Sequence, residues 1–352
     1  MLSRPDAQTS VDEDALPGGS GNEGNRRQSR RQRWVSIFGV GAFVIGSAIM
    51  VDRDGLFLSS DEVLLWVVAA LVALSLSDLH RVGFRLLWDW LPFGLLLVLF
   101  HYAHGLSVLL GTHPHSLLQI KFDELLFGKP LLTLQLQHAF HQTQHVRFWE
   151  YFLWVVYLTY FFLALVVAGA LWRFNYPGFR RFRTRFVVLS GLGCLTYAIY
   201  PADPPWLVSQ DLRELPTIYR VLYEAWGSVG LHSAGGLVEQ GSAFHDESAA
   251  VPSLHAGATM LVCLFFWKTA RPWARALLVF YVLAMAFTLV YAGEHYVFDI
   301  FTGWLYAAVV VVVINYLARR RSARAAPPHP PPLPTSPPSS STEATPVAVA
   351  TQ

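Results

Sequence analysis

Long apolar runs alternate with polar segments along most of the chain. They cover about residues 34–51, 62–78, 84–106, 151–172, 185–201, 253–269, 274–292 and 299–318. A helix needs roughly 17 to 25 apolar residues to cross the hydrocarbon core of a bilayer, and each run is about that long. The pattern therefore predicts an all-α fold, a polytopic bundle of about eight transmembrane helices.

The segments between and beyond these runs predict the domain organisation. Two long connections, 107–150 and 202–252, include the amphipathic stretch FDELLFGKPLLTLQLQHAF, which predicts short helices at the membrane interface. Both ends of the chain lack apolar periodicity and are expected to be disordered. We therefore expect a basic tail at 1–33, two accessory helices at 34–83, a six-helix membrane core at 84–318 and a Pro/Ser-rich tail at 319–352.

Composition supports a membrane protein. Hydrophobic residues make up 53% of the chain and charged residues 14%, with a mean hydropathy of +0.38. The net charge of +2 is too small to suggest a nucleic-acid partner. Cys194 and Cys263 both lie in apolar runs, so neither a disulfide framework nor a cysteine zinc site is expected.

Basic residues predict the orientation in the membrane. An even number of spans places both termini on one side, and arginines gather at 26–33, 173–185 and 319–324 on that side. The opposite loop, 202–252, contains only Arg213 and Arg220 as basic residues. By the positive-inside rule, both termini are cytoplasmic and the two long loops face the periplasm or exterior of the cell membrane.

Three polar clusters lie at the predicted outer ends of the spans. They are YPADPPW at 200–206, VPSLHAG at 251–257 and GEHYVFD at 293–299. Because the spans bring these ends to the same face, the clusters are expected to form one site.

The spacing of three residues suggests their chemistry. His295 and Asp299 are four positions apart at a helix start, so the carboxylate can orient the imidazole as a nucleophile or base. His255 is expected in the first helical turn, with Pro252 near the first helical position and Ser253 as the cap, where a phosphate can bind. Structural explanations also exist: a self-satisfying His–Asp pair, and a polar residue at a wet interface.

PSLH followed 40 positions later by HYVFD resembles the second and third motifs of the type 2 phosphatidic acid phosphatase superfamily. Together with YPADPPW, these motifs are similar to the branch containing fungal inositol phosphorylceramide synthase and bacterial inositolphosphotransferase-like proteins. The resemblance covers about residues 84–318. It implies that His295 forms a phosphohistidine, Asp299 orients it and His255 protonates the leaving group, without a metal or cofactor.

The resemblance also has departures. YPADPPW replaces a Lys-x6-Arg-Pro motif, and Thr288-Leu289 occupy the positions of a Ser-Arg pair. The cations that would stabilise the phosphate must then come from elsewhere, and outer-loop candidates are Arg213, Arg220, Lys121 and Lys129. Other expected substrate contacts are Tyr200, Pro204, Pro205, Trp206 and Ser253. Asp203 would disfavour a nearby anion, although it could bind a sugar hydroxyl.

Two further features have simpler explanations. His138, His141 and His145 have a spacing compatible with metal ligation, but no carboxylate or cysteine completes a ligand set, so no metal site is expected. Trp206 is expected in an interfacial aromatic belt, where it could also contact a ligand.

Three functions fit these observations. The first is transfer of a phospho-headgroup, and the second is hydrolysis of a lipid phosphate or polyprenyl pyrophosphate. The substrate in either case is a phospholipid or isoprenoid phosphate among membrane lipids. The third is a non-catalytic transporter or scaffold, although transporters usually place polar residues near the bilayer midplane. The acceptor and the oligomeric state do not follow from the sequence.

Overall fold

The computed structural model describes residues 35, 37–50, 60–76, 79–142, 145–211, 215–222 and 248–325. An apolar helix at Ile37–Met50 comes first. It is followed by α2 (Ser60–Leu74), α3 (Leu79–Leu109), α4 (Leu117–Phe127), α5 (Leu132–Phe140), α6 (Phe148–Phe174), α7 (Tyr176–Ile199), α8 (Pro205–Asp211), α11 (Leu254–Phe266), α12 (Pro272–Tyr291) and α13 (Val297–Ala325). The predicted tail at 1–33 lies outside the described residues, whereas α13 continues seven residues into the predicted C-terminal tail.

Each predicted apolar run coincides with a helix, which confirms the all-α membrane bundle. Within the described ranges, four helices have segments long and apolar enough to cross a membrane: α3, α6, α12 and α13. The helix at Ile37–Met50, α2 and α11 are apolar but shorter. Helix α7 has 24 residues, but its first half contains four arginines, which lower its hydropathy. That eight helices span the membrane stays a prediction.

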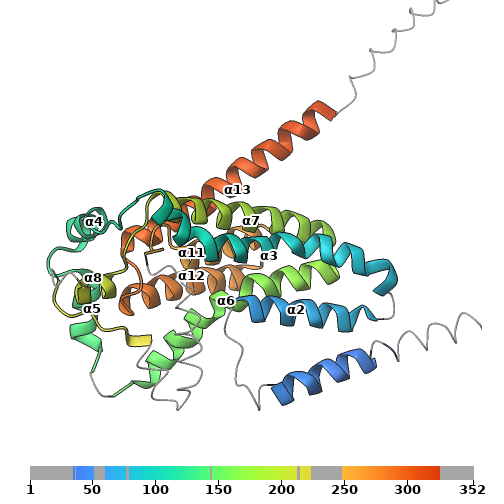
Figure 1. The fold of residues 1–352 in the computed structure, drawn as a ribbon, viewed down its shortest axis with the longest axis horizontal. Helices are drawn as coiled ribbons and strands as arrows, with labels where there is room; N and C mark the ends of the chain where they lie inside the picture. Colours follow the sequence, from blue (N-terminus) through green and yellow to red (C-terminus); the bar gives the residue numbers. More distant parts are fainter. Residues whose placement is uncertain are drawn as a thin grey trace, which may run out of the picture. The chain divides into compact units, whose positions relative to one another are not determined.

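The described residues up to Val313 form one compact unit, in which the helices pack side by side (Figure 1). Helix α7 packs against α3 and α6, and α11 packs against α6, α7 and α12. The short helices α4, α5 and α8 lie together at one end of this bundle (Figure 1). Residues 314–352 form a second unit, whose described part is the arginine-rich end of α13.

A buried carboxylate joins three helices through the arginine-rich segment. Asp89 of α3 is 4% exposed and accepts hydrogen bonds from Arg183 Nη1 of α7 at 2.6 Å and Trp172 Nε1 of α6 at 3.0 Å. The Tyr176 hydroxyl also donates to it, at 3.3 Å. A buried charge is costly unless it is paired, and here it is paired with a guanidinium. The arginines predicted to set topology therefore also hold tertiary contacts.

Two glycines let the helices that carry the polar motifs approach closely. A Cβ atom at Gly303 of α13 would overlap the backbone carbonyl oxygen of Ser253, and one at Gly257 of α11 would lie 3.1 Å from the Gly303 carbonyl oxygen. The backbone N–H of Ser253 donates to the Asp299 carbonyl at 2.9 Å across this contact. The second and third motifs thus meet backbone to backbone.

We expect Gly303→Ala to destabilise the protein, because backbone atoms cannot rotate away from the added methyl group. Overpacking of this kind costs about 1–3 kcal/mol. Thermal unfolding in detergent micelles measures the effect. Gly191→Ala in α7 is the matched control, since a Cβ there meets nothing within 4 Å. Equal unfolding temperatures for the two variants would show that the close approach is not required.

Candidate active site

Backbone hydrogen bonds bring the three polar motifs together. Ala202 of YPADPPW forms isolated parallel bridges with His115 on one side and Ala249 on the other. Its N–H donates to the Ser248 carbonyl at 2.6 Å, and its own carbonyl accepts from the Ala250 N–H at 3.0 Å. The segment before the second motif therefore adjoins the first motif, while Ser253 joins the second motif to the third.

His295 and Asp299 form a buried pair. His295 Nδ1 lies 3.3 Å from Asp299 Oδ2, and their side chains are 7% and 0% exposed. The same Oδ2 accepts the backbone N–H of Tyr296 at 2.9 Å. A carboxylate held in this way orients the imidazole. Because it contacts Nδ1, the Nε2 nitrogen of His295 is left to act as a nucleophile or base.

His255 faces this pair from the first turn of α11. Its ring lies 5.6 Å from the His295 ring, centroid to centroid, in an edge-on arrangement. Tyr157 and Tyr160 of α6 flank the His255 ring with centroids 4.9 and 3.9 Å away. The sequence did not single out these tyrosines, because both belong to a continuous apolar and aromatic run that indicates only a membrane span.

The start of α11 differs slightly from the predicted one. Ser253 is the N-cap, as expected, and its Oγ accepts the Ala256 N–H at 3.3 Å. Pro252, however, precedes the cap and is not near the first helical position, which is Leu254. Its carbonyl accepts the Tyr197 hydroxyl at 2.7 Å, so it ties the entry to α11 to α7.

Thr288 and Leu289 offer no polar group to a phosphate. Both side chains are fully buried, and Thr288 Oγ1 donates back to the Ala284 carbonyl at 2.7 Å. The Leu289 carbonyl accepts the backbone N–H groups of Glu294 and His295, at 3.1 and 3.2 Å. These positions therefore shape the loop that carries His295.

Of the candidate cations, Arg220 lies beside the His295 loop. Its Nε donates to Glu294 Oε1 at 2.9 Å, and its guanidinium lies 4.3 Å from the centre of the Trp206 ring. Arg220 and Glu294 both interact electrostatically with Tyr157, the ring stacked on His255. Lys129 instead pairs with Glu124 at 3.2 Å and is 77% exposed.

Arg213 is outside the described residues, and Lys121 is exposed. Trp206, predicted for an aromatic belt, is instead buried in a cluster with Ile218 and Tyr296. Its backbone N–H donates to the Gly293 carbonyl at 3.1 Å, so the first motif is hydrogen-bonded to the loop that carries His295.

The remaining residues of YPADPPW organise the chain locally. The Tyr200 ring stacks on His115 with centroids 4.5 Å apart. The Pro204 carbonyl accepts the N–H groups that open α8, and Pro205 is the first residue of that helix. Asp203 Oδ1 accepts the Ser248 hydroxyl at 2.6 Å, which gives this carboxylate a role in joining the first motif to the segment before the second.

Asp123 of α4 is a site residue that the sequence did not reveal. It is 1% exposed, and its two carboxylate oxygens accept the N–H groups of Val297 and Phe298 at 3.0 and 3.2 Å. Burial, the largest influence, raises the pKa of Asp123 to about 6, and the Asp299 charge adds to this effect against the two hydrogen bonds. No local spacing could have indicated it, since 174 residues separate Asp123 from Val297.

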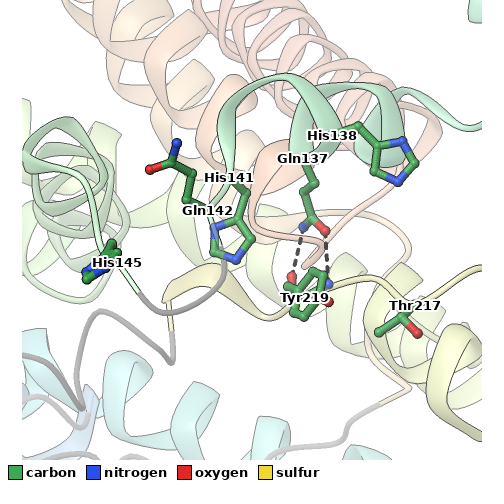
Figure 2. A pocket seen from close by; sticks show the side chains of 7 residues that line it. All are labelled: Gln137, His138, His141, Gln142, His145, Thr217 and Tyr219. Atoms are coloured by element: carbon green, nitrogen blue, oxygen red, sulfur yellow. Dashed lines mark hydrogen bonds between the residues drawn. The ribbon is translucent and has the colours of Figure 1, made fainter.

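His138, His141 and His145 line a separate cavity of about 530 Å³ (Figure 2). Gln137 in its lining donates to the Tyr219 and Tyr291 carbonyls, both at 2.8 Å, and so holds the residue before the His295 loop. His138 and His145 lie on either side of His141, which pairs with Glu150 at 3.2 Å (Figure 2). Among the described residues, no three potential ligands converge on a metal position.

The raised pKa of Asp123 predicts how stability depends on pH. The folded protein binds this proton with a pKa of about 6, against 3.8 for the ordinary carboxyl, so protonation stabilises the fold as the pH falls through that window. Asp123→Asn cannot titrate there. The unfolding temperature of the wild type minus that of the variant should therefore rise between pH 7 and pH 4. A constant difference would contradict the shift.

Comparison with known families agrees with this geometry. The family model of the PAP2 superfamily matches residues 129–313, slightly more than half of the chain, including all three polar motifs. No curated protein and no solved structure matches the chain. The chain therefore belongs to the PAP2 superfamily, and the protein is a membrane enzyme of the phosphatase or phosphotransferase type.

Proposed function

We propose that the protein cleaves or transfers a phosphate ester group of a lipid through a phosphohistidine at His295. The observation that carries the proposal is the buried His295–Asp299 pair with the His255 ring 5.6 Å away. That separation allows one phosphate group to contact both imidazoles. Asp299 orients His295 as the nucleophile, and His255 is the general acid.

The proposed reaction has two balanced steps. In the first, the lone pair of His295 Nε2 attacks phosphorus, the bond from phosphorus to the leaving oxygen breaks, and His255 donates its proton to that oxygen. In the second, water or an alcohol attacks the phosphorus, neutral His255 accepts the proton, and the nitrogen–phosphorus bond breaks. The positive charge that develops on His295 is stabilised by the Asp299 carboxylate.

Anion binding is assigned to two groups. The first turn of α11, capped by Ser253, presents backbone N–H groups and the positive end of the helix dipole next to His255. Arg220 adds a cation beside Glu294, the residue that precedes His295. Both groups suit the equatorial oxygens of a phosphoryl transition state.

The finer proposal is transfer of a phospho-headgroup, similar to an inositolphosphotransferase. The arginine and lysine positions of the phosphatase motifs are replaced here by uncharged or acidic residues. A phosphodiester carries one negative charge, whereas a phosphomonoester carries about 1.5 to 2 at neutral pH. A site with few cations is therefore better suited to the diester. Hydrolysis of a lipid phosphate or polyprenyl pyrophosphate is the alternative.

The catalytic proposal predicts the behaviour of four variants. His295→Ala should abolish turnover, and His255→Ala should lower it by roughly 10²- to 10⁴-fold because the leaving group loses its acid. Asp299→Asn should lower it by a comparable factor, since an amide orients the imidazole less well. His138→Ala, on an exposed position of α5, is the matched control.

The assay is incubation of purified protein with phosphatidic acid, phosphatidylinositol and polyprenyl pyrophosphate in mixed micelles, followed by mass spectrometry of the products. An alkaline quench preserves phosphohistidine, which should be present in the wild type and absent in His295→Ala. Full activity in both histidine variants would exclude this mechanism. A product in which the phospho-headgroup is joined to an added alcohol identifies a transferase.

The proposed orientation places both termini in the cytoplasm and the active site on the periplasmic or exterior face. The inner loops and the end of α13 are rich in arginine, which supports it. A reporter fused after Arg324 should therefore be active on the cytoplasmic side, and a tag inserted near Gly235 should be labelled from outside intact cells. The opposite pattern would place the site on the cytoplasmic face.

A further inference from the structure

Three consecutive backbone N–H groups at the start of α13 are satisfied by two carboxylates. Asp299 Oδ2 accepts from Tyr296 at 2.9 Å, while Asp123 accepts from Val297 at 3.0 Å and Phe298 at 3.2 Å. The first N–H groups of a helix have no partner within the helix itself. The turn that carries the His–Asp pair is therefore capped by a residue from a distant outer-loop helix.

We propose that Asp123 is a positioning residue for the reaction, which holds Asp299 in place to orient His295. The inference rests on the proposed function. Asp123 contacts neither histidine in the described hydrogen bonds. It acts through the backbone of α13, because it accepts the N–H of Phe298, the residue directly before Asp299, and the Asp299 carboxylate contacts His295 Nδ1.

The physical reason is competition for a carboxylate. Without Asp123, the N–H groups of Val297 and Phe298 would be buried without an acceptor, which is unfavourable because neither could bond to water instead. Asp299 is the acceptor nearest along the chain, and its Oδ1 has no hydrogen-bond partner among the described residues. Rotation of Asp299 toward these N–H groups would move its Oδ2 away from His295. Because Asp123 accepts these two N–H groups, the Asp299 carboxylate stays on His295.

The Asp123 carboxyl group is buried, although a carboxylate is more stable in water. Asp123 is almost fully buried, and Asp299, with its own negative charge, lies close enough to raise the pKa of Asp123 further. A cap needed only for helix stability could be a neutral serine or asparagine at the start of α13 itself. A carboxylate supplied from α4 accepts two N–H groups at once and leaves Asp299 to the histidine.

The neighbouring residue on α4 provides a matched control. Glu124 has the same charge one position away, but its carboxylate pairs with the exposed Lys129 at 3.2 Å and makes no described contact with α13. Glu124→Gln should therefore leave turnover within about two-fold of the wild type, because exposed ion pairs contribute little.

The first readout is steady-state turnover of phosphatidic acid and phosphatidylinositol in mixed micelles. Asp123→Ala should lower kcat by about 10- to 100-fold with little change in KM, because it misplaces a catalytic pair and removes no substrate contact. Asp123→Asn keeps one acceptor oxygen, so its kcat should lie between those of Asp123→Ala and the wild type. Unfolding temperatures and size-exclusion profiles establish that each variant is folded.

The second readout does not depend on turnover. In protein labelled with ¹⁵N-histidine, the ring nitrogen shifts of His295, assigned by their loss in His295→Ala, report its tautomer. Asp123→Ala and Asp123→Asn should change these shifts, whereas Glu124→Gln should not. If the wild type turns over neither lipid, the proposed function fails while the spectra still test the positioning role. Unchanged kcat and shifts in folded variants, or a failure of Asp123→Asn to fold, would overturn the proposal.

Discussion

The start of α13 is the constraint on which the site depends. The first residues of this helix are buried, and a buried N–H without a partner costs as much as a lost hydrogen bond. Asp299 and Asp123 together satisfy three of these N–H groups, and the Asp299 carbonyl accepts the N–H of Ser253. The positions of His295, the α11 start and α4 all follow from these bonds.

The loop between α12 and α13 is held from several directions. Gln137 binds the Tyr291 carbonyl, Trp206 binds the Gly293 carbonyl, and Arg220 pairs with Glu294. Each contact comes from a segment that is distant in sequence. Polar networks of this kind rigidify a site when every member is satisfied, which a nucleophile of fixed orientation requires. Gln137, Trp206 and Arg220 thus support the reactive loop.

The close packing of α11 on α13 explains how two histidines 40 positions apart come to face each other. Gly257 and Gly303 remove the side chains that would separate the two backbones. Small residues serve the same purpose wherever membrane helices must approach closely. The aromatic rings of Tyr157 and Tyr160, on α6, pack against the His255 ring.

The sequence by itself determined the helices, the three polar motifs and the His–Asp pair. Apolar periodicity and an i, i+4 spacing are local properties, and short-range rules read them directly. The cap of Ser253 was predictable for the same reason. Pro252 lies two residues before the first helical residue, Leu254, because helix boundaries depend on the exact backbone path.

Only the tertiary structure decided which residues of the two long connections support the site. FDELLF has the pattern of an interfacial helix, and nothing in it separates Asp123, buried against α13, from Glu124, paired with an exposed lysine. The same holds for Arg220 among the candidate cations and for the tyrosines of α6. Their roles arise from contacts between segments many residues apart. Each contact is made by a single residue, so it produces no periodic pattern in the sequence.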